Sequence, residues 1–164
     1  MNLNIPYLET DNKLLNDAYR IAAGDIVGNI VYYQNGLLTE EKPCMIAGLD
    51  YNTPWTRDTA INIWNALSIL SPEVSKNTLL AVLEEEEGSI YIGGQYWDSI
   101  IWMIGAREYC RFHKDDNFYR LAFEAGRNSV HRLEEDEFDE EDGLFRGPAV
   151  YGDGIAADPD KYSK

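Results

Sequence analysis

Apolar residues recur at three- and four-residue steps along five segments of the chain, which is the spacing of helices that bury one face. This pattern predicts helices over residues 11–30, 59–70, 73–86, 98–112 and 116–133. The fourth segment is apolar on nearly every side, so we expect other elements to surround that helix. The alternation typical of strands is weak throughout, with at most a short hairpin near Ile90 to Ile92. We therefore predict an all-α fold.

Glycine, proline and asparagine separate these segments into loops. Ser71-Pro72 is expected to end the second helix, because proline disfavours helical geometry in the residue before it. The other breakers are Asn35-Gly36, Pro43, Gly48, Pro54, Gly88, Gly93 and Gly94. The alternation of helices and loops continues without a repeated sequence, and we treat residues 1–164 as one domain. The absence of repeats also argues against a helical-repeat protein that binds peptides.

The strongly negative net charge of the chain makes some classes of binding partner unfavourable. The chain has 29 acidic and 14 basic side chains and a net charge of -15, so binding to nucleic acid or to an anionic membrane surface is not expected. The longest strongly apolar run, Ser99 to Ala106, is far shorter than a membrane span. Met1 to Thr10 lacks the pattern of a signal peptide, which favours a cytoplasmic location, although a leader removed earlier would leave the same sequence.

The cysteines and histidines do not have the spacing of a metal site. Cys44 and Cys110 are far apart, and His113 and His131 have no partner at ligand spacing. The acidic runs 84–87 and 134–142 are interpreted as solvated helix ends. A calcium loop ending near Gly143 is unfavourable, since Phe138 stands where an oxygen ligand is needed. We predict no metal and no cofactor.

Three loops are rich in the side chains that recognise sugars. Flat aromatic rings stack on sugar C–H surfaces, while Asp and Arg make charge-assisted hydrogen bonds to neighbouring hydroxyls. The candidate binding residues are Tyr51, Trp55, Arg57 and Asp58 in the first loop, Trp97 and Asp98 in the second, and Arg146 and Tyr151 in the third, which also carries Asp153. If alternate loops meet at one end of the helical array, these residues form one pocket for an oligosaccharide or glycoside.

The stretch Trp55-Thr-Arg-Asp58, which opens the second predicted helix, resembles glucoamylases and their relatives among the six-hairpin glycosidases. In that family such a stretch lines the subsite for the sugar whose bond is cut. Trp97-Asp98 and the acidic-then-aromatic run Glu141 to Phe145 extend the likeness more loosely. The resemblance implies the amino-terminal part of an inverting glycoside hydrolase, with helical hairpins forming about half of an (α/α) six-hairpin barrel.

The sequence departs from this family at the catalytic loop. The family places a catalytic glutamate after the loop's aromatic residue, whereas Arg146 follows Phe145 here, and arginine does not donate a proton at neutral pH. Asp153 is our predicted general acid, with Glu141 and Asp142 as alternatives. Inversion also needs a second carboxylate roughly 6.5–9.5 Å away. The family's base lies near the end of a barrel of twelve helices, so we assign none, and whether the chain is an enzyme stays open.

Structural interpretations compete with these roles. Asp58 and Asp98 each stand near a helix start and could serve only as caps; Arg146 could bridge to the acidic run, and Asp153 could only make a turn. Trp64 and Trp102 lie on apolar helix faces, so we predict that both are in the core and outside the site. The alternative function is a non-catalytic helical sugar-binding or assembly fragment. Half a barrel would expose its inner helix faces and favour self-association.

Overall fold

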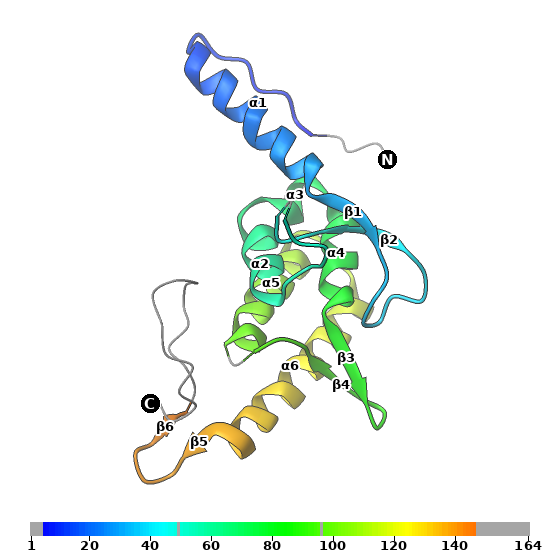
Figure 1. Ribbon diagram of the computed structural model, residues 1–164, viewed down its shortest axis with the longest axis vertical. Coiled ribbons are helices and arrows are strands. Elements are labelled where there is room, and N and C mark those ends of the chain that lie inside the picture. The colour runs from blue at the N-terminus through cyan, green and yellow to red at the C-terminus, as the bar shows by residue number, and fades with distance from the viewer. Residues whose placement is uncertain (1–4, 49, 96, 147–164) are drawn as a thin grey trace.

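The chain combines helices with three separate two-stranded antiparallel sheets (Figure 1). The computed structural model describes residues 5–48, 50–95 and 97–146. The helices are α1 (Lys13–Gly28), α2 (Thr56–Asn62), α3 (Ser68–Leu70), α4 (Pro72–Ala81), α5 (Asp98–Phe112) and α6 (Asp116–Glu137), and a π-helical turn, η1 (Ile63–Leu67), joins α2 to α3. The paired strands are β1 (Ile30–Tyr33) with β2 (Lys42–Met45), β3 (Leu83–Glu86) with β4 (Ser89–Ile92), and β5 (Phe138–Asp139) with β6 (Leu144–Phe145).

The prediction of an all-α fold made of helical hairpins is therefore wrong. The first helix ends at Gly28, and the run Ile-Val-Tyr-Tyr that follows forms β1. Such β-branched and aromatic residues favour strands when they can pack against a partner. That partner is β2, with Val31 opposite Cys44, in a segment that we had interpreted as a loop. The arrangement is mixed α and β, and it does not support half of a six-hairpin barrel.

The helix predicted over residues 73–86 is shorter in the structure, because its last residues form the first strand of the β3–β4 hairpin. Glutamate has a high helix propensity, but α4 ends at Ala81 and the glutamates extend as β3. Glu87 and Gly88 both have positive φ angles, 51° and 79°, which make the tight turn favoured between paired strands. Leu83 lies opposite Ile92, and both are buried. Burial of this cross-strand pair outweighs the local preference for helix.

Helix α5 lies at the centre of the core, as its apolar sequence predicts. It packs against α2, α4 and α6. Trp102 of α5 is completely buried, its indole Nε1 donates a hydrogen bond to the carbonyl of Leu79 at 3.3 Å, and its ring lies 6.4 Å from that of Phe118. Gly105 brings α5 against α2, because a Cβ there would lie only 2.8 Å from the Cα of Ala60. This close packing fixes the relative positions of the two helix starts.

Two apolar surfaces remain exposed. Helix α1 extends away from the other helices (Figure 1), and none of its residues is buried. Trp64 was predicted to be in the core, but its residue is 54% exposed on η1. The spacing of apolar residues indicated a helix correctly and did not show how many sides of it are covered. No helix in the described part of the chain has the length and apolar character needed to cross a membrane.

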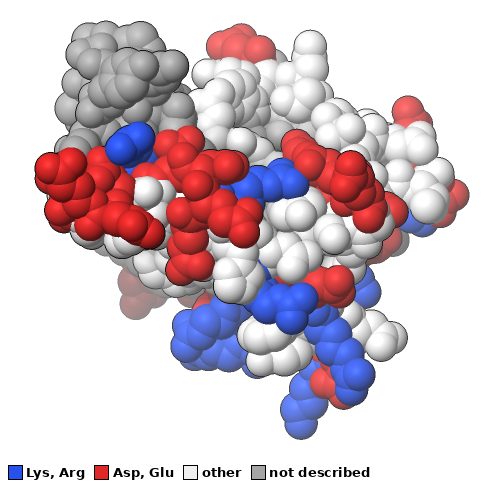
Figure 2. Space-filling model, turned by 90° about the horizontal axis from the view of Figure 1, so that it is seen from below, with Lys and Arg blue, Asp and Glu red and all other residues white. Residues whose placement is uncertain are grey.

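Charges are unevenly distributed over the surface. In Figure 2, acidic side chains gather in a band on the lower face of the molecule, and basic side chains gather mostly apart from that band. The acidic residues come from the tip of the β3–β4 hairpin and from the last turns of α6 and the turn after it. An excess of negative charge concentrated in this way produces a field that attracts cations.

The buried thiol of Cys44 allows a prediction about alkaline pH. Burial raises the pKa of Cys44 to about 12, and a hydrogen bond with Thr78 opposes that rise. Because the unfolded thiol titrates near a pKa of about 8.5, this group stabilises the fold fully below that pH and loses its effect as pH rises toward 12. Urea unfolding between these pH values should show falling stability, with a shallower decline for Cys44→Ala. Equal slopes for the two proteins would contradict the prediction.

Candidate functional site

The first turns of α2 and α5 meet through a partly buried ion pair. Arg57 Nε donates to Asp98 Oδ1 at 3.0 Å, although the two residues are 41 positions apart in the sequence. The Arg57 side chain is 20% exposed and that of Asp98 is 8% exposed. A guanidinium and a carboxylate removed from water in this way interact more strongly than a surface pair. The structure therefore joins two of the loops in which the sequence indicated sugar-binding residues.

Asp98 has a role different from that of a helix cap. The N-cap position of α5 is Trp97, whose side chain makes no capping bond. Asp98 is the first residue of the helix, and its Oδ2 accepts a hydrogen bond from the backbone N–H of Gln95 at 2.9 Å in the preceding loop. One carboxylate oxygen of Asp98 thus binds Arg57, and the other binds the loop at Gln95. The structure does not support the interpretation of Asp98 as a helix cap alone.

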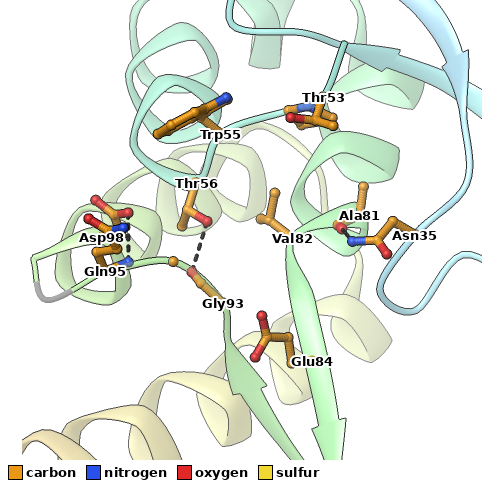
Figure 3. A pocket seen from close by; sticks show the side chains of 12 residues that line it. Asn35, Thr53, Trp55, Thr56, Ala81, Val82, Glu84, Gly93, Gln95 and Asp98 are labelled. Atoms are coloured by element: carbon orange, nitrogen blue, oxygen red, sulfur yellow. Dashed lines mark hydrogen bonds between the residues drawn. The ribbon is translucent and has the colours of Figure 1, made fainter. Parts of the chain in front are cut away.

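A pocket of about 230 Å³ (Figure 3) is lined by Asp98, the acidic partner of this ion pair, whereas Arg57 is not among its lining residues. Its walls are residues 53–56 before and at the start of α2, Ala81, Val82 and Glu84 where α4 leads into β3, and the loop 93–95, with Asn35 and Asp98 completing the lining. Thr56 Oγ1 donates to the carbonyl of Gly93 at 2.8 Å and links two of the walls. The pocket thus has a polar base fixed by contacts distant in the sequence.

Two aromatic rings lie at the first loop. Trp55 lines the pocket and is 48% exposed, and Tyr51 is 46% exposed. Their ring centroids are 5.7 Å apart and the rings meet edge to face at 72°. This contact orients the indole while leaving about half of the residue accessible. An accessible, oriented aromatic ring beside polar groups is the combination that stacks against a sugar ring.

Asp58 lies in the first turn of α2, half-buried, where a carboxylate is favoured by the positive end of the helix dipole. It does not line the pocket, whereas its neighbour Trp55 does.

Trp97 and Arg146 both line a second, smaller hollow, which shares no lining residue with the main pocket among those that the structure describes. Trp97 is 45% exposed, and it lines this hollow together with Ile100 and Arg146. Arg146 Nη2 and Nε lie 2.7 and 3.2 Å from Oδ2 of Asp139, a residue that is 6% exposed. The interpretation that Arg146 bridges to the acidic run therefore matches the structure. Of the third loop, Tyr151 and Asp153 lie outside the described residues.

Glu84 is the pocket residue that the sequence analysis missed. We interpret it from the sequence as part of a solvated helix end; it is exposed, but it belongs to β3 and lines the pocket. The signal that could have located it is the pair Gly93-Gly94 at the end of the opposing strand, since glycines there allow close approach of the backbone to other groups. Among the residues that the structure describes, no group of three or more His, Cys, Asp or Glu side chains is placed to hold a metal ion.

Comparison of the chain with protein-family models, with curated proteins and with solved structures finds no match. A relationship to glucoamylases, suggested by Trp55-Thr-Arg-Asp58, thus stays a prediction from the sequence. The function is inferred below from the residues that line the pocket.

Proposed function

We propose that the pocket between α2 and α5 binds a sugar, and that the chain is the sugar-binding part of a glycoside hydrolase. The observation that carries the proposal is that Asp98, held by the ion pair with Arg57, lines the same pocket as the half-exposed indole of Trp55. The Asp98 carboxylate, oriented by Arg57, offers an acceptor to sugar hydroxyls, and the indole covers the C–H face of the ring. The resemblance of residues 55–58 to a glucoamylase subsite agrees with this role.

The size of the pocket supports a small ligand. Its volume of about 230 Å³ is below the roughly 300–1,000 Å³ of pockets that enclose drug-sized molecules. We therefore expect it to hold one sugar ring, with any further rings extending over the surface. Trp97, half-exposed and adjacent in the sequence to Asp98 of the pocket, offers a second aromatic surface for such an extension.

In the proposed hydrolase, Asp98 orients the substrate and does not donate the proton. Both of its oxygens already accept hydrogen bonds, from Arg57 and from the backbone of Gln95. The proton donor that we propose is Asp153, and the mechanism is inversion by a carboxylic acid and a second carboxylate that activates water. Each positioned proton transfer contributes typically about 100- to 10,000-fold to the rate. Binding by the pocket does not depend on either group.

A non-catalytic sugar-binding or assembly fragment is the second candidate. The exposed apolar residues of α1, among them Leu14 at 78% and Ile21 at 62%, favour it because such surfaces commonly mark contacts with other proteins. Sugar binding at the pocket is common to both candidates. Turnover of a glycoside that depends on Asp153 is expected only for the hydrolase.

Trp55→Ala tests the proposal directly. We expect it to weaken binding of glucose and of short gluco-oligosaccharides by about tenfold or more, because an aromatic stacking surface contributes on the order of 1–3 kcal/mol. Binding is measured by titration of the amide resonances of residues around the pocket. Trp64→Ala is the matched control, since Trp64 is 54% exposed and does not line the pocket. Equal effects of the two substitutions, or no sugar binding by the parent chain, would refute a sugar site here.

A further inference from the structure

The β3–β4 hairpin places one glutamate of its acidic run at the pocket. Side chains alternate between the two faces of a strand, so Glu84 and Glu85 point to opposite sides. Glu84 lies opposite Tyr91 and lines the pocket, whereas Glu85 lies opposite Ile90 and does not line it. Figure 3 shows the Glu84 carboxylate turned from β3 toward Gly93. Neighbouring glutamates with the same charge are thus placed in different surroundings.

The Gly93-Gly94 segment separates two carboxylates. A Cβ added at Gly93 would lie 2.5 Å from Oε1 of Glu84, and one added at Gly94 would lie 2.7 Å from Oδ2 of Asp98. Consecutive Cα atoms are about 3.8 Å apart, so the two acidic groups lie on either side of a very short piece of backbone. Gly94 also has a φ of 115°, which other residues rarely adopt. Two adjacent glycines allow both carboxylates to approach this wall of the pocket.

The carboxylates of Asp98 and Glu84 differ in whether a basic side chain pairs with them. Asp98 is paired with Arg57. Two residues along β3 from Glu84, Glu86 is paired with Arg132 Nη2 at 2.7 Å, and the guanidinium of Arg132 stacks 3.4 Å from the centre of the Tyr91 ring. Within the described part of the chain, no ion pair involves Glu84. The pocket lining therefore has two carboxylates, of which Asp98 is balanced by Arg57.

We propose that the pocket prefers a sugar that carries a positively charged amino group, and that Glu84 binds this ammonium. The inference rests on the proposed sugar site and specifies its class of substrate. In such a complex the ring stacks on Trp55 and its hydroxyls meet Asp98, which Arg57 holds in place. The ammonium then supplies the positive charge that balances Glu84. A charge-assisted hydrogen bond at a solvated carboxylate is weaker than a buried one, so we expect a moderate preference.

The test compares three monosaccharides that differ at one position: D-glucosamine, N-acetyl-D-glucosamine and D-glucose. Each is titrated into the 164-residue chain at fixed ionic strength, at a pH where the free amine is protonated, and binding is followed by amide chemical shifts. We expect glucosamine to bind about five- to tenfold more tightly than the two uncharged sugars. Glu84→Gln should remove this preference, so that the three sugars bind the variant with similar affinities. Added salt should reduce the preference as well.

Glu85→Gln is the matched control, because it changes the net charge equally on the other face of the same strand. It should leave the preference for glucosamine intact. Equal affinities for the three sugars, or equal loss of preference in Glu84→Gln and Glu85→Gln, would overturn the role of Glu84. In that case glucose binding that depends on Trp55 would still support the sugar site, whereas the absence of binding by every sugar would overturn both proposals.

Discussion

Trp102→Ala should lower the free energy of unfolding by about 3–5 kcal/mol, the range typical of removing a large aromatic side chain from a core. Trp102 is completely buried on α5, in contact with Phe118, and its indole N–H satisfies the carbonyl of Leu79. Alanine would leave a cavity and an unpaired carbonyl in the centre of the molecule. Since domains of this size are stable by about 5–15 kcal/mol, the variant would have lost a large part of its stability.

Urea unfolding followed by circular dichroism measures this effect, with Trp64→Ala as its control. Trp64 is 54% exposed, and substitutions at exposed positions usually change stability by about 0.5 kcal/mol or less. The two variants remove the same side chain from neighbouring helical segments in different surroundings. Comparable losses would mean that α5 is not the centre of the core. Unfolding of Trp102→Ala before any urea is added would agree with the prediction.

The sequence predicted α5 well because its signal is local. Fifteen residues with apolar side chains on most faces form a helix wherever it is buried, and the observed bounds, Asp98–Phe112, equal the predicted ones. The strands were missed for the opposite reason. Whether Leu83–Glu86 forms a strand or continues the helix depends on its pairing with Ser89–Ile92 and on the burial that the two strands share. Neither can be determined from the sequence of the segment alone.

The candidate site, like the fold, was predictable only in part. The motif around Trp55 and Arg57 and the loop before Asp98 were identified from residue types, and the structure brings both loops to one pocket. Glu84 could not be distinguished from the glutamates beside it, because strand alternation and the close approach of Gly93 become visible only once the hairpin is known. Residue type therefore indicated the chemistry, and the topology determined which carboxylate reaches the pocket.

Arg57→Ala should have the other large effect, on stability and on sugar binding together. Removing one partner of a buried pair leaves an uncompensated charge, which costs about 3–5 kcal/mol when burial is complete. Arg57 is 20% exposed, so we expect a loss near the lower end of that range. Asp98 would also lose its orientation beside the pocket, so glucose binding should weaken in parallel. Urea unfolding and amide chemical-shift titration measure the two effects.

A double-mutant cycle separates the pair from its surroundings. Arg57→Ala and Asp98→Ala each leave a charge unpaired, whereas the double variant leaves none, so its loss of stability should be clearly smaller than the sum of the single losses. Arg132→Ala is the matched control. Its pair with Glu86 is 39% and 50% exposed, and surface pairs contribute only about 0.2–1 kcal/mol. Strictly additive losses at Arg57 and Asp98, or an equal loss at Arg132, would show that this ion pair does not help to hold α2 against α5.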